Sequence, residues 1–384
     1  MQDFNFHSPV RVVFGKSSHL GLKNLVSNYG NKVLLVYGGG SIKANGVYQK
    51  VLEQLQGLEV QEFAGIEPNP RVETIRKAVV LGKQFQPDLV LAVGGGSVID
   101  AAKLIAASIN YQGDPWDFLV KPHTESSKYV ALATVLTLAA TASEHNSGAV
   151  ITNWETHEKL FFGRDQLYPR FSILNPEFTF SVNKEQSAYG TIDAFVHVLE
   201  QYINTSLQTP MQDRFSEGIL LTLIENGPKV LDEPENYDVR ANIMLCASFA
   251  LNGMIAMGAG QDWATHSIEH EFSGFYDIPH AAGLAVILPH YLRVAKSHKL
   301  AKLVQYGKRI WNLSGSDTDI AEAAIQKTAD FFNSLGAKPN LKAWDIDSEH
   351  FDTITSRLMS IGSVGEIKLT EGELRIVLEK SLGV

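Results

Sequence analysis

Four side chains in the second half of the chain could bind a divalent cation: Asp193, His197, His266 and His280. Asp193 and His197 are four residues apart in the amphipathic segment TIDAFVHVLEQY, so a helix would place them on the same face. His266 lies in a second helical segment, and His280 follows Pro279, where the chain leaves a loop. Three imidazoles and one carboxylate suit Fe(II), Zn(II), Ni(II) or Co(II) with one coordination position left open.

A fifth side chain, His270, stands four residues after His266 in the segment QDWATHSIEHEF. A single histidine on a helix is more often a packed or surface residue than a ligand. His270 therefore has three readings: a proton relay beside the reacting centre, a group that orients a ligand, or a packed helix residue.

A glycine turn, GGGSVID at 94–100, lies between an apolar strand and a helix. Glycines let the backbone approach a phosphate closely, and a helix N-terminus supplies free N–H groups. The spacing differs from GxGxxG, so the triplet also fits a tight turn without a ligand. Asp100, in the first helical turn, either complements the helix dipole or hydrogen-bonds a cofactor amide.

A second glycine turn, Gly38-Gly39-Gly40-Ser41, follows the strand KVLLVY. NAD-selective sites place an acidic residue near the end of such a strand, where it binds the ribose hydroxyls. This turn carries no carboxylate, whereas its N–H groups and the Ser41 hydroxyl suit a 2′-phosphate, to which Lys43 could add charge. The pattern favours NADP(H) over NAD(H).

Hydroxyl groups gather in a third turn, TLAATASE, which supplies Thr137, Thr141 and Ser143. These groups either line a cofactor or cap the turn. Lys159 follows in HEKLFF and either reaches the cofactor or is an exposed lysine.

The elements that must position these residues change character along the chain. Up to about residue 182, strands alternate with helices, which predicts a parallel sheet with helices on its faces. Beyond it, only long amphipathic segments occur. We predict a domain of residues 1–182 and an all-helical domain of residues 183–384. The strands are expected at 9–14, 32–37, 58–64, in DLVLAV and YVALATV, and in AVIT, KLFFG and FSILNP; the helices of the first domain at about 43–56 and 70–85 and after the glycine triplet; those of the second at about 185–203, 211–231, 236–256, 260–272, 282–297, 298–312, 317–335, 346–360 and 370–382.

Composition excludes several classes of protein. The chain has 384 residues, a net charge of −9 and no basic run, which argues against a nucleic-acid partner. Cys246 is the single cysteine, so no intrachain disulfide is possible and no cysteine metal knuckle exists. The start lacks the features of a signal peptide, and no apolar run has membrane-spanning length. We expect a cytoplasmic enzyme with no membrane partner.

The whole chain resembles the iron-containing alcohol dehydrogenase family, and within it the branch of butanol dehydrogenases and NADPH-dependent aldehyde reductases. The segments that carry the resemblance are FNFHSPVRVVFGK, GGGS, QDRFSEGILLTLIENGPKVL, EPENYDVRANIM and QDWATHSIEHEFS. The resemblance implies a Rossmann-like α/β dinucleotide-binding domain and an all-α domain, an architecture like that of dehydroquinate synthase, with the active site in the cleft between them. It also implies a homodimer.

Site residues follow from the resemblance position by position. The metal is expected on Asp193, His197, His266 and His280, with His270 near the reacting centre. The cofactor is expected to contact Gly95, Gly96 and Ser97 through its pyrophosphate, Gly38, Gly39, Gly40 and Ser41 through its adenosine and 2′-phosphate, Asn69 through its ribose or adenine, Thr137, Thr141, Asn146 and Lys159 further along, and Asp100 near the nicotinamide.

Two positions depart from the family pattern. Ala139 stands where the branch usually has proline, and Ala142 stands where it usually has glycine. The extra methyl group at Ala142 lies beside the cofactor turn, which weakens the assignment of Thr141 and Ser143.

The expected reaction is a reversible hydride transfer between NADP(H) and a small aldehyde or primary alcohol, with the metal, Fe(II) or Zn(II), as a Lewis acid on the carbonyl oxygen. An alternative is a lyase like dehydroquinate synthase, but the apolar neighbours Phe195 and Val196 disfavour the anionic substrate that such an enzyme binds. A metal-dependent phosphohydrolase is disfavoured because the chain contains no His-Asp dipeptide.

Overall fold

The structure is a computed structural model that describes residues 1–206, 208–362 and 364–383. The chain divides into two compact units, here called the sheet unit (residues 8–182 and 234–248) and the helical unit (residues 1–7, 183–233 and 249–384). The predicted domains 1–182 and 183–384 stay a prediction. By their contacts, residues 1–7 and 234–248 each belong to the unit on the other side of that boundary.

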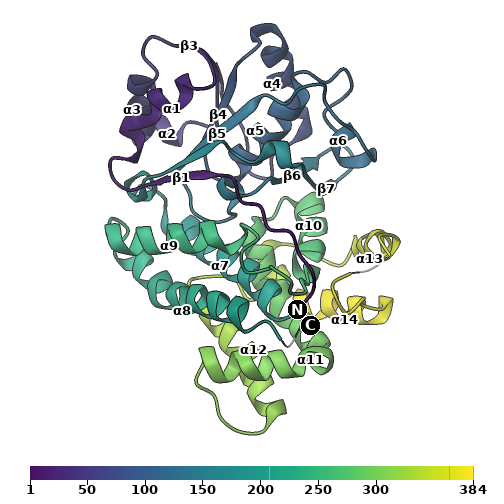
Figure 1. Ribbon diagram of the computed structural model, residues 1–384. Coiled ribbons are helices and arrows are strands. Elements are labelled where there is room, and N and C mark those ends of the chain that lie inside the picture. The colour runs from purple at the N-terminus through teal and green to yellow at the C-terminus, as the bar shows by residue number, and fades with distance from the viewer. Residues whose placement is uncertain (207, 363, 384) are drawn as a thin grey trace. The chain divides into compact units, whose positions relative to one another are not determined.

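The sheet unit is built on six parallel strands in the order β1-β8-β5-β4-β2-β3. Of these, β1, β3, β4 and β5 are labelled in Figure 1. Two of the inner strands, KVLLVY and LVLAVG, are apolar on both faces, which suits strands covered on both sides. Their alternate side chains enter two separate cores. The strands are β1 (Arg11–Phe14), β2 (Lys32–Tyr37), β3 (Glu59–Phe63), β4 (Leu89–Gly94), β5 (Ala131–Leu136) and β8 (Phe171–Leu174).

Helices cover both faces of this sheet, as predicted. The helices α4 (Val72–Phe85) and α5 (Gly96–Ser108) pack with Leu34 and Val90 on one face, and α1 (Leu22–Ser27) and α3 (Val47–Gln54) pack with Leu35 and Leu91 on the other. Since β2 pairs with β4 in parallel, the two glycine turns that follow these strands lie at the same edge of the sheet, the one formed by the carboxyl ends of the strands. This edge holds the candidate cofactor site.

Two further strands form an antiparallel hairpin outside the main sheet, β6 (Gly148–Asn153) and β7 (Glu158–Gly163). They correspond to the predicted strands AVIT and KLFFG. The expected helix at 43–56 is interrupted, because Gly46 adopts φ +80° between α2 (Ser41–Ala44) and α3. The remaining short helix of this part is α6 (Asp117–Val120).

The described residues after Leu174 contain helices and no strand, as the change in sequence character predicted. The two segments expected at 282–297 and 298–312 form one element, α11, whose φ/ψ leave the helical region at Lys299 (φ −114°, ψ 15°). The helices are α7 (Lys184–Tyr202), α8 (Pro210–Asp232), α9 (Tyr237–Ala250), α10 (Ala264–Tyr276), α11 (His280–Ile310), α12 (Asp317–Ser334), α13 (Phe351–Ser360) and α14 (Glu371–Leu382).

None of the helices that the structure describes combines the length and the apolar character needed to cross a membrane.

Candidate metal centre and cofactor site

Helix α7 supplies the first two candidate ligands from one buried face. Asp193, His197 and Glu200 lie at positions i, i+4 and i+7, and their exposed fractions are 2%, 5% and 2%. The apolar residues around them belong to the core of the helical unit, so a charged face is brought inside it. A buried carboxylate needs a charged or hydrogen-bonding partner, and this face therefore requires an explanation.

The other two candidate ligands approach from α10 and α11. His266 lies in the first turn of α10, and His280 is the first residue of α11. One ligand atom each from Asp193, His266 and His280 lies within 4.8 Å of the other two. The ring centroid of His197 is 4.4 Å from that of His266. The structure thus brings together all four residues that the sequence singled out for a metal.

All three imidazoles use the same nitrogen for a protein contact. The Nδ1 atom of His197 donates to the Asp193 carbonyl oxygen at 2.9 Å, that of His266 bonds the Glu200 carboxylate, and that of His280 bonds the Glu269 carboxylate. A carboxylate or carbonyl on one ring nitrogen fixes the tautomer and leaves the other nitrogen, Nε2, as the ligand.

Two of these rings are held by Glu200 and Glu269, which are not among the residues expected from the sequence. A signal was present for each: Glu200 is seven residues after Asp193 on the same helical face, and Glu269 directly precedes His270. Both carboxylates are buried. Their partners, however, come from other helices, so spacing alone did not identify them.

Two buried atoms at the centre, Asp193 Oδ1 and His266 Nε2, make no hydrogen bond, although Asp193 Oδ1 lies 3.1 Å from Nδ1 of His197. Buried polar atoms are rarely left unpaired in proteins. Burial opposes charge on Asp193, yet the neighbouring His197 outweighs it and lowers the pKa of the Asp193 carboxyl to about 2. A charged carboxylate and an unpaired imidazole nitrogen that face the same space fit a divalent cation.

His270 lies at the border of this cluster. Its ring centroid is 5.6 Å from that of His280 and 6.3 Å from that of His266. A nitrogen of His270 also lies within 4.8 Å of ligand atoms of Glu269 and His280. It is half-buried, unlike His266, so it combines proximity with partial access to solvent.

In the sheet unit, the first glycine turn leads from β4 into α5. Gly95 is the N-cap of α5 and has no side-chain cap, so the first N–H groups of the helix are available to a ligand. A Cβ atom at Gly96 would lie 2.4 Å from the Thr141 Oγ1 atom. Glycine is therefore required here by the neighbouring turn, whether or not a phosphate binds. Ser97 is half-buried beside it.

The second glycine turn leads from β2 into α2. Gly40 has φ +130°, a conformation that favours glycine, whereas Gly39 and Ser41 are exposed. Lys43 lies over the rings of two tyrosines, Tyr37 at 5.1 Å and Tyr48 at 4.6 Å.

A carboxylate that the sequence analysis did not foresee lies beside this turn. Glu62 of β3 accepts hydrogen bonds from the Tyr37 hydroxyl at 2.7 Å and the Tyr48 hydroxyl at 2.8 Å. Pairing of β3 with β2 brings it there, over a separation of 25 residues from Tyr37. The turn itself carries no acidic side chain, but its surroundings do.

The other expected cofactor residues form two contacting groups. Lys159 donates to the Asn69 side chain at 3.1 Å, and both residues are buried. Asp100 accepts from the Val150 N–H at 2.9 Å and from the Ser143 hydroxyl at 2.5 Å, so its carboxylate ties α5 to the hairpin. Burial raises the pKa of Asp100.

The second group continues through a lysine that sequence analysis passed over. Lys103 is fully buried and donates to the side chains of Ser143 at 2.9 Å and Asn146 at 3.0 Å. Thr137 is buried at the end of β5, where its N–H donates to the Gly94 carbonyl oxygen at 3.0 Å.

The departure at Ala142 has a structural counterpart. Ala142 adopts φ +54° and ψ 16°, in the left-handed region that favours glycine, and it is buried. The methyl group is thus accommodated in a conformation that an alanine rarely adopts. At Ala139 the structure shows a half-buried residue packed against the core.

Comparisons with known proteins cover nearly the whole chain. A family model described as iron-containing alcohol dehydrogenase matches residues 9–176, and one described as the C-terminal part of the Fe-containing alcohol dehydrogenase family matches residues 187–373. The chain is 46% identical to the probable NADH-dependent butanol dehydrogenase 1 of Bacillus subtilis (strain 168), with all of both proteins covered. It is 45% identical to the NADPH-dependent aldehyde reductase YqhD of Escherichia coli (strain K12), over 94% of each.

Solved structures share the fold. The crystal structure of YqhD from E. coli K-12 aligns with a TM-score of 0.96 at 43% identity and covers 99% of both chains. The NADH-dependent butanol dehydrogenase A of Thermotoga maritima aligns with a TM-score of 0.95 at 35% identity, again over 99% of both chains.

Proposed function

Because this chain belongs to the iron-containing alcohol dehydrogenase family, we propose that it is a metal-dependent oxidoreductase that transfers hydride between NADPH and small aldehydes such as butanal. Membership of the family implies a divalent metal and a nicotinamide cofactor. The observation that carries the proposal is the buried cluster on α7, α10 and α11, in which one ligand atom each of Asp193, His266 and His280 lies within 4.8 Å of the others and His266 Nε2 makes no hydrogen bond.

Four side chains would hold the metal: Asp193, His197, His266 and His280. A divalent ion bound there, Fe(II) or Zn(II), would supply a Lewis acid for the substrate oxygen. Glu200 and Glu269 orient His266 and His280 through their Nδ1 atoms, so the ligand nitrogens are in place before an ion arrives.

The cofactor would bind at the edge of the sheet where the two glycine turns lie. The free N–H groups at the start of α5 suit a pyrophosphate, and Lys159 with Asn69 offers a cation and an amide for the sugar. The remaining expected contacts (Gly38, Gly39, Gly40, Ser41, Gly95, Gly96, Ser97, Asp100, Thr137, Thr141 and Asn146) are proposals of the same kind.

Preference for NADPH over NADH is the finer part of the proposal, since relatives of both kinds are similar to this chain. The exposed Ser41 hydroxyl and the Lys43 ammonium could meet a 2′-phosphate. The Tyr37 hydroxyl beside it raises the pKa of Lys43, which keeps the cation charged. Glu62 works against an anion here, although two tyrosine hydroxyls already engage its carboxylate.

His270 would move a proton between solvent and the substrate oxygen, because it is near the proposed ligands and half-buried. The substrate would be a small aldehyde or primary alcohol, in a cytoplasmic homodimer; a sedimentation measurement of the mass in solution tests the dimer.

The decisive assay measures the initial rates of NADPH and NADH oxidation with butanal, on protein freshly loaded with Fe(II) or Zn(II). We expect faster turnover with NADPH, and its loss in Asp193→Ala and His280→Ala.

Lys43→Ala should raise the KM for NADPH and leave that for NADH nearly unchanged. In His270→Gln, the metal content should stay as in the unchanged protein while the pH profile of kcat/KM changes.

Three results would count against parts of this proposal. A preference for NADH would refute the reading of the Gly38–Ser41 turn alone. A pH profile of His270→Gln identical to that of the unchanged protein would remove the proton relay. Absence of turnover with either nucleotide, on protein with bound metal, would favour the lyase alternative.

A further inference from the structure

Two lysines on α11, Lys299 and Lys302, are buried in the helical unit. Their side chains are 0% and 1% exposed, and they are three residues apart. Each ammonium is paired with a buried carboxylate, Lys299 with Asp262 at 3.0 Å and Lys302 with Asp213 at 2.5 Å. Because an unpaired buried charge is strongly unfavourable, such pairs tie the segments they join. The two lysines differ in the segments that they tie.

Lys299 joins three segments that are distant in sequence. Its ammonium donates to the Ile203 carbonyl oxygen at 2.7 Å, just after α7, and contacts Glu366 Oε2 at 3.0 Å. Asp262, its third partner, lies just before α10. Lys299 is also the residue at which α11 departs from helical φ/ψ. The break in the helix and the buried ammonium therefore coincide.

Asp262 carries this connection into the turn before α10. Its Oδ2 also accepts from the Tyr291 hydroxyl, and its Oδ1 accepts from the Glu366 N–H at 3.0 Å. The next residue, Trp263, is the N-cap of α10 and adopts φ +64°. A bulky side chain adopts this conformation rarely and keeps it only where neighbouring contacts enforce it. Asp262, the residue directly before Trp263, is held at this turn by its bonds with Tyr291 and Glu366.

The same turn is attached to a proposed metal ligand. The Asp262 N–H donates to the Glu200 carbonyl oxygen at 3.1 Å. The Glu200 carboxylate accepts from the Thr265 N–H at 2.6 Å and bonds Nδ1 of His266. Contacts thus lead without a gap from Lys299 through Asp262 and Glu200 to His266.

We propose that Lys299 is a positioning residue for the metal centre: through Asp262 it holds the first turn of α10, and with it His266, in the geometry that binds the ion. Without the ammonium, the buried Asp262 carboxylate would face Glu366 with no cation between them. The turn at Trp263 would then relax and shift the His266 ring. This inference depends on the proposed metal centre.

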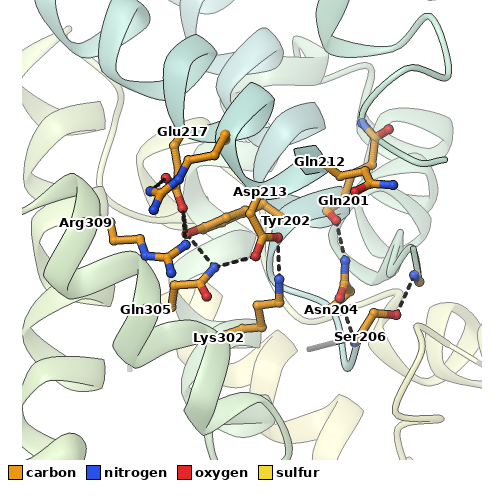
Figure 2. A network of polar contacts seen from close by, with 12 residues as sticks. Gln201, Tyr202, Asn204, Ser206, Gln212, Asp213, Glu217, Lys302, Gln305 and Arg309 are labelled. Carbon is orange, nitrogen blue, oxygen red and sulfur yellow. Dashed lines mark hydrogen bonds and ion pairs between the residues drawn. The ribbon is translucent and has the colours of Figure 1, made fainter. Parts of the chain in front are cut away.

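Lys302 provides a matched control on the same helix. Figure 2 shows its ammonium on Asp213, which also accepts from Gln305 at 2.9 Å. Gln305 donates to the Tyr202 hydroxyl at 3.0 Å, Tyr202 donates to Glu217 at 2.9 Å, and Glu217 accepts from Arg309 at 2.7 Å. The Arg309 side chain is 37% exposed, so this network leads to the surface. It meets α7 at Tyr202, the last residue of that helix, and the bonds named here do not reach Glu200 or His266.

The test titrates metal-free protein with Co(II) alone and compares the unchanged chain with Lys299→Met and Lys302→Met. The dissociation constant comes from competition with a chelator, and the visible absorption bands of Co(II) report the ligand geometry. Substitution of a group that holds a metal ligand in place typically lowers metal affinity by about 10–100-fold. We expect a loss of that size and altered bands in Lys299→Met, and neither change in Lys302→Met.

Loss of folding is controlled in two ways. Both substitutions remove one buried ammonium, so a general loss of stability would act on both variants alike. Tyr291→Phe removes only the hydroxyl that donates to Asp262, and it should weaken Co(II) binding in the same direction by a smaller factor.

Three outcomes would overturn the inference. The inference would be wrong, with the metal centre intact, if the unchanged chain bound Co(II) with the same affinity as Lys299→Met and Tyr291→Phe. It would also be wrong if Lys302→Met lost as much Co(II) affinity as Lys299→Met. Absence of Co(II) binding to the unchanged chain would refute the proposed metal centre together with the inference.

Discussion

At the scale of residues, the proposed metal centre depends on which nitrogen each imidazole presents. His197, His266 and His280 all bond a protein oxygen through Nδ1, and two of these oxygens belong to the buried carboxylates of Glu200 and Glu269. A carboxylate behind an imidazole raises its basicity and restricts its rotation. Glu200 and Glu269 would therefore orient the proposed ligands His266 and His280 without binding the ion themselves.

Lys103 shows a comparable arrangement in the sheet unit. It is buried on α5 and donates to the Ser143, Asn146 and Gly148 oxygens, so it anchors the segment that includes one expected cofactor contact. Burial disfavours the charged form and lowers its pKa to about 8, against the opposing effect of Asp100 and Glu144.

This lowered pKa predicts a pH dependence of stability. Between pH 8 and 10.5 the folded chain has released the Lys103 proton while the unfolded chain still binds it. The unfolded state then binds more protons, so Lys103 makes the free energy of unfolding rise with pH through this window. Lys103→Met lacks that proton. The thermal midpoint of the unchanged chain minus that of Lys103→Met should therefore increase as pH rises from 8 to 10.5. A constant difference would contradict the lowered pKa of Lys103.

At the scale of elements, α8 packs closely against α7, which carries two of the proposed ligands. A Cβ atom at Gly227 of α8 would lie 2.9 Å from Thr191 Cγ2, two residues before Asp193. Gly218 lies on the same helix but is exposed, and a Cβ atom there would meet no atom within 4 Å. Substitutions at Gly227 therefore test the close packing of α7 and α8, whereas substitutions at Gly218 test helix propensity alone.

Alanine substitutions at these glycines should act in opposite directions. Gly218→Ala should stabilise by about 0.5–1 kcal/mol, because alanine favours the helix. Gly227→Ala should destabilise by about 1–3 kcal/mol, because the added methyl group forces α7 and α8 apart. Chemical denaturation followed by circular dichroism measures both, and stabilisation by Gly227→Ala would mean that the helices pack less closely than described.

At the scale of the whole molecule, the proposed ligands span residues 193–280 and come from three helices, so a bound ion would cross-link α7, α10 and α11. An ion that binds only the folded state stabilises it by mass action, by about 2.7 kcal/mol at a free concentration one hundred times the dissociation constant.

Metal removal should therefore lower the thermal midpoint of the unchanged chain. Asp193→Ala should melt at the same temperature with and without a chelator, since it lacks one ligand and the charge that attracts the ion. The measurement is a melting curve of each protein loaded with Zn(II) and then treated with chelator. An equal chelator effect on both proteins would place the stabilising ion elsewhere.

Local patterns in the sequence were sufficient for the parallel sheet, the helical second part, the two glycine turns and the five histidine and aspartate side chains that cluster. Such features depend on residues within a few positions of one another, and the periodicities of strands and helices predict them. The break in the 43–56 helix was missed because Gly46 is compatible with a helix until its φ is known.

Only the tertiary structure decided which charges stand behind these groups. Glu200 meets His266 across 66 residues, Glu62 meets Tyr37 across 25, and Lys299 meets Glu366 across 67. Local spacing does not predict such pairs, because each pair depends on how helices or strands pack. From the sequence alone, a charged residue on an amphipathic segment is normally expected to face solvent. Buried charges become recognisable once packing excludes water and each must find its partner.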